Sequence, residues 1–180
     1  TKFLEKPKNE TYTIVIPGAV SQKRRDYERV LKSIKIFHFP LEIIFLGKAQ
    51  GKELEMLQNF EQSKPENISI KYFKEKVPQD VFDDYMQKAD VLWCPIQQET
   101  EFFSQKEIYG ITKMSGNIGD AVKFGKSAVF PENYPSNYSF IIPEKGSLGD
   151  FLFIKKDVDF SEFSKEKVIQ ELEKTIFALL

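Results

Sequence analysis

The sequence predicts an α/β fold, a Rossmann-like three-layer αβα sandwich with a mostly parallel sheet of about six strands. Three observations support this prediction. Short apolar runs alternate with amphipathic segments along most of the chain. Several of these runs stop at proline or glycine, which commonly end strands. The length of 180 residues and the apolar content of 41% suit one domain with a proper core.

The strands are predicted from apolar or alternating runs that are bounded by turn residues. The first is YTIVIP at 12–17, and the others lie at 41–46, 68–73, 89–94, 127–130 and 140–142. Helices are predicted where apolar residues recur at helical spacing, at 24–37, 51–62, 78–86, 120–124 and 164–180. The polar segments 97–106 and 131–139 predict loops, and 148–154 is either helical or extended.

Composition excludes several classes of function. The formal net charge is -1 and charges of both signs are interspersed, which argues against a nucleic-acid-binding protein. No apolar run approaches the roughly 20 residues of a membrane-spanning helix. The one cysteine, Cys94, cannot form an internal disulfide and suits a reducing compartment. With one histidine and one cysteine, the sequence predicts no metal site.

A basic loop follows the first predicted strand. Gly18 would let the backbone approach a ligand closely. Three consecutive cations, Lys23, Arg24 and Arg25, stand where the next helix is expected to open. Cations there oppose the helix dipole unless an anion binds. The loop therefore predicts a diphosphate clamp, and the alternative is a solvated basic turn that nearby acids balance.

The segment 107–131, EIYGITKMSGNIGDAVKFGKSAVFP, is the most informative part of the chain. Its small residues precede a short helix, for which Gly125 suits a left-handed C-cap. Backbone N–H groups at such a helix opening can bind a phosphate. The segment therefore predicts a binding site formed by Tyr109, Gly110, Lys113, Ser115, Gly116 and Asn117. The order of residues matches neither a Walker loop nor a first Rossmann turn. The alternative is an ordinary αβ unit with glycines in its turns.

Two acids bracket this glycine-rich segment. Glu107 precedes it and Asp120 follows it, and carboxylates at the rim of a phosphate site often hold a pair of sugar hydroxyls. The alternatives are an exposed loop acid for Glu107 and a favourable charge in the first helical turn for Asp120. Lys76 and Val77 follow the strand at 68–73, where the backbone before Pro78 could face a flat base. Without other support, a plain βα loop is the favoured interpretation of that segment.

The order of these segments resembles the C-terminal, donor-binding domain of GT-B glycosyltransferases, especially glycosyltransferase family 4. The resemblance covers about residues 12–145. It is carried by IPGAVSQKRRDYERVL, IIFLGKAQGKELEML, ISIKYFKEKVPQDVFDDYMQKADVLWCP with its Ala89-Asp90-Val91 triplet, EIYG and DAVKFGKSAVFP. The family usually has a second glutamate eight residues after the first, and that position is Ser115 here. Asp120-Ala121 takes the place of its Glu-Ala pair only with an insertion of about five residues, and Lys126-Ser127 lacks the usual proline.

The resemblance implies a hexosyltransferase whose donor is a nucleoside diphosphate sugar of UDP or GDP type and whose acceptor is a glycan or a lipid-linked acceptor. Lys23, Arg24 or Arg25 would hold the diphosphate, and Lys76 and Val77 would lie near the base. Glu107, Tyr109 and Gly110 would face the donor sugar, and Glu107 and Asp120 are the candidate catalytic residues. The family implies retention of anomeric configuration, a role in polysaccharide assembly and a cytoplasmic location at the inner face of the membrane.

The expected organisation follows from this resemblance. Residues 1–11 are a linker or the end of a preceding domain, and 12–163 form the nucleotide-sugar-binding domain. The amphipathic helix at 164–180 would pack on this domain or reach toward a missing N-terminal acceptor domain. Two other functions stay open: a non-catalytic flavodoxin-like interaction module, and the GT-B-like half of a sugar-nucleotide epimerase. A receiver-like module is disfavoured because the first strand ends in Pro17-Gly18 without clustered acids.

Overall fold

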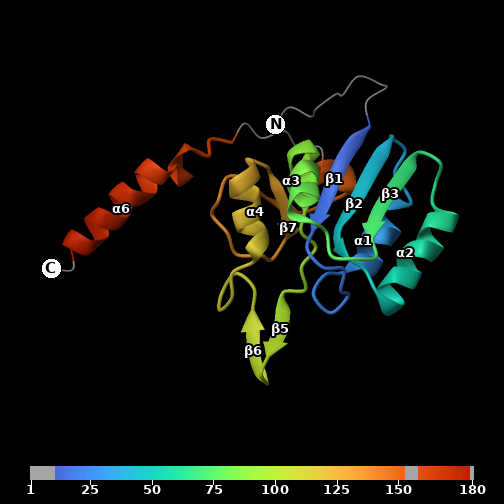
Figure 1. Cartoon of the computed structure of the whole chain (residues 1–180), viewed down its shortest axis with the longest axis horizontal. Coiled ribbons are helices and arrows are strands. Elements are labelled where there is room, and N and C mark those ends of the chain that lie inside the picture. The colour runs from blue at the N-terminus through green and yellow to red at the C-terminus, as the bar shows by residue number, and fades with distance from the viewer. Residues whose placement is uncertain (1–10, 153–157, 179–180) are drawn as a thin grey trace.

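The computed structural model of the protein describes residues 11–152 and 158–178 and has the predicted α/β architecture (Figure 1). Six parallel strands form one sheet in the order β3-β2-β1-β4-β7-β8. They are β1 (Tyr12–Pro17), β2 (Leu41–Lys48), β3 (Ile68–Phe73), β4 (Val91–Trp93), β7 (Ala128–Pro131) and β8 (Ile141–Glu144). All six strands were predicted, with ends that differ by two residues at most.

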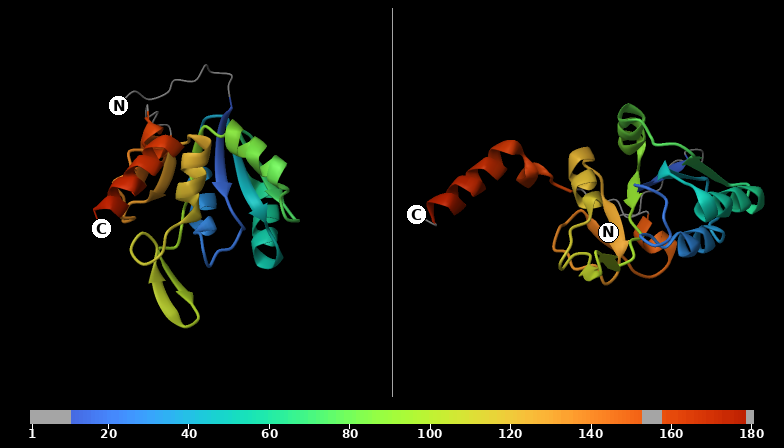
Figure 2. Two further views of the ribbon diagram at one scale, coloured as in Figure 1. Left: turned by 60° about the vertical axis from the view of Figure 1, so that its left-hand side comes forward. Right: turned by 60° about the horizontal axis from the view of Figure 1, so that its bottom comes forward.

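Helices cover both faces of this sheet, as Figure 2 shows from two further sides. The helices are α1 (Tyr27–Ile34), α2 (Gly51–Ser63), α3 (Gln79–Lys88), α4 (Gly116–Phe124), α5 (Leu148–Leu152) and α6 (Lys165–Phe177). Because strand side chains alternate between faces, Ile14 and Ile16 join one core cluster while Val15 joins the other. The first cluster includes residues of α1, α2 and α5, and the second includes residues of α3 and α4. The result is the predicted three-layer sandwich.

Two helices begin elsewhere than predicted, because capping side chains fix their first turns. The α1 helix begins at Tyr27 rather than residue 24, since the Asp26 carboxylate accepts the N–H of Arg29 at 3.1 Å. The three consecutive cations therefore precede the helix and lie outside its first turn. The α4 helix begins at Gly116 rather than 120, since Ser115 caps it. It ends at Gly125, which has the expected left-handed conformation with φ of +61°.

The segment 97–106, predicted as a loop, instead contributes to a β-hairpin. Strand β5 (Glu99–Phe102) pairs antiparallel with β6 (Gln105–Ile108), and the hairpin projects beyond the edge where the strands end (Figure 1). Its turn places Phe103 and Ser104 at φ of +48° and +62°. The prediction failed because glycine or asparagine usually signals such a turn, and neither occurs there.

The C-terminal part of the described chain behaves in two ways. Val158, Phe160 and Phe163 pack against the second core cluster. The α6 helix leads away from the sheet (Figure 1), and its apolar side chains are exposed, with Leu172 at 58% and Phe177 at 74%. The apolar face of α6 is exposed, so the structure does not show the predicted packing of this helix on the domain. A contact with a further domain stays a prediction. The linker predicted at 1–11 lies almost wholly outside the described residues, as do 153–154 and 179–180.

Neither a membrane-spanning helix nor a metal-binding cluster occurs among the described residues. No helix in this part of the chain is long and apolar enough to cross a bilayer. The same residues contain no group of three or more His, Cys, Asp or Glu side chains placed to hold a metal ion.

Candidate functional site

The direction of strand order reverses at the middle of the sheet. From β1 the chain winds through β2 to β3 on one side, and from β4 it winds through β7 to β8 on the other. In open parallel sheets, ligands bind outside the carboxyl ends of the strands at such a switch point. Here it lies between the ends of β1 and β4. Two loops meet there, because the Asp26 N–H donates to the Pro95 carbonyl at 2.8 Å and the Gln97 N–H to the Arg24 carbonyl at 2.8 Å.

Gly18 makes room for a guanidinium at this point. Its φ of +101° is rare for residues with a side chain, and a Cβ atom there would lie 2.6 Å from Nη2 of Arg25. The next strand also lies close, because a Cβ on Gly47 would meet the Gly18 carbonyl oxygen at 2.3 Å. The backbone at Gly18 was predicted to lie close to a ligand, and in the structure the side chain of Arg25 takes that space.

Arg25 is partly buried and held by two polar contacts. Its Nη1 donates to the Ala19 carbonyl at 3.3 Å, and its Nη2 donates to Oδ1 of Asn117 at 3.1 Å. Its backbone also forms an isolated bridge with Ile96. Within the described residues, no carboxylate lies at ion-pair distance from this guanidinium. The charge of Arg25 is thus positioned by neutral groups.

Asn117 is the centre of this cluster and is only 4% exposed. Its Oδ1 accepts from Arg25, while its Nδ2 donates to the Pro17 carbonyl at 3.3 Å and to Oδ2 of Asp120 at 3.2 Å. Ser115 is equally buried, and its hydroxyl accepts the Asn117 N–H at 3.3 Å. One amide side chain therefore joins the end of β1, the basic loop and the first turn of α4.

Asp120 is the acid nearest to this network. Burial raises the pKa of its carboxyl, and the hydrogen bond from Asn117 and the charges of Arg25 and Lys123 oppose that rise. The amide of Asn117 stands between this carboxylate and the guanidinium of Arg25, since it bonds to both. Cation and acid therefore share a neutral partner instead of neutralising each other directly.

Lys113 and Glu107 form a separate group. The Lys113 ammonium is paired with the Glu107 carboxylate, and it lies 5.7 Å from the ring centroid of Tyr109. Lys113 and Gly110 line a hollow between the loops 110–114 and 132–138, and Glu107 shares another hollow with Lys23. The predicted phosphate site thus divides, with Arg25, Ser115 and Asn117 in one group and Lys113 with Glu107 in another.

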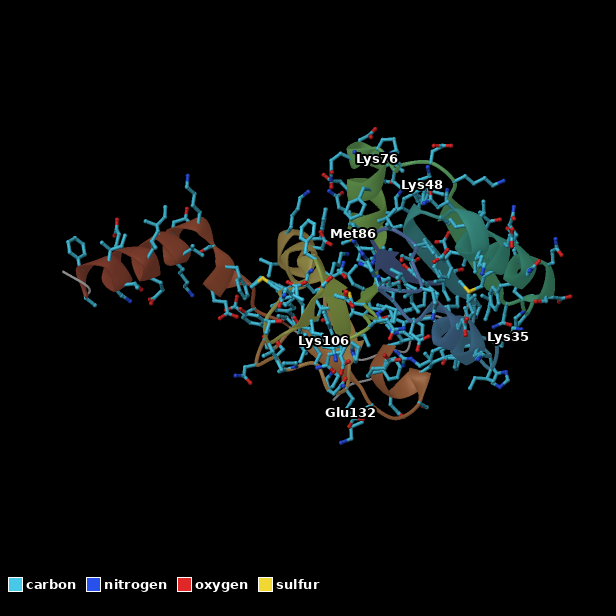
Figure 3. All side chains as sticks on the ribbon, turned by 90° about the horizontal axis from the view of Figure 1, so that it is seen from below. Lys35, Lys48, Lys76, Met86, Lys106 and Glu132 are labelled. Atoms are coloured by element: carbon cyan, nitrogen blue, oxygen red, sulfur yellow. The ribbon has the colours of Figure 1, made fainter. Side chains whose placement is uncertain are left out.

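The other predicted residues lie outside both groups. Arg24 and Gly116 are exposed, and Lys23 is exposed on the rim of the hairpin hollow. Val77 packs against the second core cluster, which accounts for it structurally. Lys76 is exposed at the end of β3, which β2 separates from β1, and Figure 3 shows Lys76 near Lys48 and on the opposite side of the view from Lys106 and Glu132. Among the described residues, no hydrogen bond or ion pair joins Lys76 to the Arg25 cluster.

Sequence reasoning missed the ion pair between Arg29 and Glu144, which lies close to the N-cap Asp26. Arg29 donates through both Nη atoms to the Glu144 carboxylate, with Nη2 to Oε2 at 2.8 Å, and its Nε lies 3.4 Å from Asp26. The Glu144 side chain is only 6% exposed. This pair ties the end of β8 to the first turn of α1. Its one signal in the sequence is an arginine three residues after the capping Asp26, and no pattern indicates Glu144.

No protein-family model matches this chain, and a search of the curated proteins finds no match. Its function therefore has to be inferred from the Rossmann-like fold and from the contacts around Arg25 and Asn117.

Proposed function

We propose that this protein is the donor-binding lobe of a glycosyltransferase and that the Arg25–Asn117 cluster binds the diphosphate of a nucleoside diphosphate sugar. The observation that carries the proposal is a partly buried guanidinium at the switch point, held by neutral groups beside the opening of α4. A cation that has no carboxylate at ion-pair distance among the described residues favours an anionic ligand, and a helix opening favours the same ligand.

The chemistry proposed for this cluster is electrostatic. When a glycosidic bond to a diphosphate breaks, negative charge grows on the leaving phosphate oxygens. A guanidinium that already points at those oxygens stabilises that charge without reorganising, and such preorganised donors contribute strongly to catalysis. Arg25 is assigned this role, and Asn117 positions it. Asp120, beside them, is the candidate for contact with a sugar hydroxyl.

The division of the predicted site changes the roles of two residues. Because Lys113 is paired with Glu107, neither is assigned to the diphosphate or to proton transfer. Their ion pair spans the loop 109–112, and we propose that it fixes this loop near the donor sugar. The acceptor, a glycan or a lipid-linked glycan, and a second lobe that closes over the carboxyl edge belong to the same proposal.

Calorimetric titration with UDP, GDP and inorganic pyrophosphate tests the proposal. We expect binding of at least one nucleoside diphosphate, and Arg25→Met should weaken it about tenfold to a hundredfold, as expected for a charge-assisted contact. Arg24→Met is the matched control, because Arg24 is the exposed neighbour on the same turn and should matter less than about twofold. Absence of binding at millimolar concentration, or equal losses in both variants, would refute the proposal.

A further inference from the structure

The hollow between the loops 110–114 and 132–138 shares no lining residue with the Arg25 cluster. It has a volume of about 920 Å³, with Ile118 of α4 in its wall. The loops meet at Gly110, where a Cβ would lie 2.7 Å from Cδ of Pro135. Ligand pockets commonly measure about 300–1,000 Å³, so this hollow is large enough for a small organic ligand.

One part of the lining is an aromatic platform. The Tyr138 ring is stacked on Phe140, with centroids 5.2 Å apart and planes 12° apart. Phe163 meets the Tyr138 ring edge-on at 5.7 Å. These contacts fix the ring while 41% of the residue stays exposed. Apolar surface continues on the opposite loop, where Ile111 is 68% and Met114 is 71% exposed.

The rest of the lining is polar and electrically compensated. Neutral hydrogen-bonding side chains come from both loops: Thr112, Asn133, Ser136 and Asn137. The two charged residues in the wall have partners, since Lys113 is paired with Glu107 and Glu132 lies 3.5 Å from Lys145. The hollow therefore offers amides and hydroxyls together with an aromatic face, and it carries little net charge.

We propose that this hollow binds a neutral saccharide. The C–H face of a pyranose ring packs against an aromatic ring, while its hydroxyls need donors and acceptors such as amides. Both kinds of group line this one hollow. A phosphate-bearing ligand would need an uncompensated cation, and a purely apolar ligand would cover the exposed amides of Asn133 and Asn137 without offering them hydrogen-bond partners. The proposal does not depend on the diphosphate site, and if that site is also correct, the saccharide is the acceptor.

Saturation-transfer NMR and calorimetry with neutral oligosaccharides test this inference on the whole chain. We expect binding of at least one gluco-, galacto- or manno-oligosaccharide without any nucleotide present. Tyr138→Ala should weaken it about tenfold by removing the platform, whereas Tyr138→Phe keeps the ring and should change it little. Asn137→Ala should also weaken binding. Asn59→Ala, an exposed asparagine on α2, is the control and should have no effect.

Three results would overturn the inference: no neutral saccharide binds at millimolar concentration, binding survives both Tyr138→Ala and Asn137→Ala, or an acidic saccharide binds in preference to its neutral counterpart. Arg25→Met separates this inference from the proposed function. Saccharide binding should persist in that variant even if diphosphate binding is lost, and it should persist in the wild type even if no diphosphate binds.

Discussion

Asn117→Asp is the sharpest perturbation of the proposed diphosphate site, because it changes one neutral atom into a charged one at a known place. The Oδ1 atom of Asn117 lies 3.1 Å from Nη2 of Arg25. In the variant, a carboxylate oxygen takes its position and forms a direct ion pair with the guanidinium. The cation then no longer needs an external anion. We expect the affinity for pyrophosphate and for nucleoside diphosphates to fall.

The size of the effect can be worked from this distance. Two unit charges about 3 Å apart attract by about 1 kcal/mol at the dielectric constant of water and by about 5 kcal/mol at an effective value of about 20. Arg25 is only partly buried, so the true value lies between these limits. A bound phosphate must compete with that attraction and loses a contact worth about 1.5–3 kcal/mol. Affinity should therefore fall about tenfold to a hundredfold.

The same change also disturbs folding, and a second substitution separates the two effects. Asn117 donates to the Pro17 carbonyl and to Asp120, so a carboxylate there faces two acceptors and costs about 1–3 kcal/mol of stability. Adding Asp120→Asn exchanges the amide and the carboxylate. The exchanged pair can restore the hydrogen bond between positions 117 and 120, while the negatively charged carboxylate stays at position 117, next to the guanidinium of Arg25.

Calorimetry with pyrophosphate and urea denaturation on the wild type, the single variants and the exchanged pair give the decisive comparison. We expect the exchanged pair to regain most of the stability that Asn117→Asp loses and to keep its weak anion binding. If the exchanged pair binds pyrophosphate as tightly as the wild type, then the charge of Arg25 is not what attracts the ligand. The electrostatic reasoning would then be wrong even though the fold is right.

Three further predictions concern stability. Burial raises the pKa of Asp120 above 3.8 in the folded state, so the protonated carboxyl stabilises the fold and this stabilisation is lost as the pH rises through the raised pKa. Asp120→Asn should therefore raise the Tm at pH 7. The difference in Tm between the variant and the wild type should shrink as the pH falls toward 3.8. Arg29→Met leaves a nearly buried carboxylate unpaired and should cost about 1–3 kcal/mol in urea denaturation, whereas Lys88→Met, in an exposed pair, should cost less than about 0.5 kcal/mol. Gly47→Ala forces a Cβ against backbone at 2.3 Å and should cost about 1–3 kcal/mol, while Gly119→Ala, in open space within α4, should add about 0.5–1 kcal/mol of stability by the same measurement.

The architecture was predictable because it depends on local periodicity. Strands buried on both faces are continuous apolar runs, and the run from Leu41 to Leu46 is buried at all but one position. Amphipathic helices separate these runs, and parallel pairing follows from the right-handed crossovers they require. The predicted fold class was confirmed for these reasons. The ends of elements were predicted less well, because capping depends on single contacts such as the one from Asp26 to the N–H of Arg29.

The hairpin shows a different kind of failure. The segment 97–106 is mostly polar, and the hairpin to which it contributes projects beyond the edge of the sheet (Figure 1). Periodicity indicates burial, so a strand that buries little leaves little periodic signal. Its turn also uses Phe103 at positive φ, a conformation that bulky residues rarely adopt. Neither the strands nor the turn could be recognised from residue type.

The pairing of charges was beyond sequence reasoning because it is decided by contacts far apart in the chain. Arg25 and Asn117 are 92 residues apart, and Arg29 and Glu144 are 115 apart. Three successive basic residues look equivalent in a sequence, yet tertiary contacts place them in different environments. Lys23 and Arg24 are exposed, while Arg25 enters the space that Gly18 leaves. A cluster of cations therefore predicts that a loop can attract an anion. Only the position of a neutral partner such as Asn117 distinguishes Arg25, the cation proposed to bind that anion, from its two neighbours.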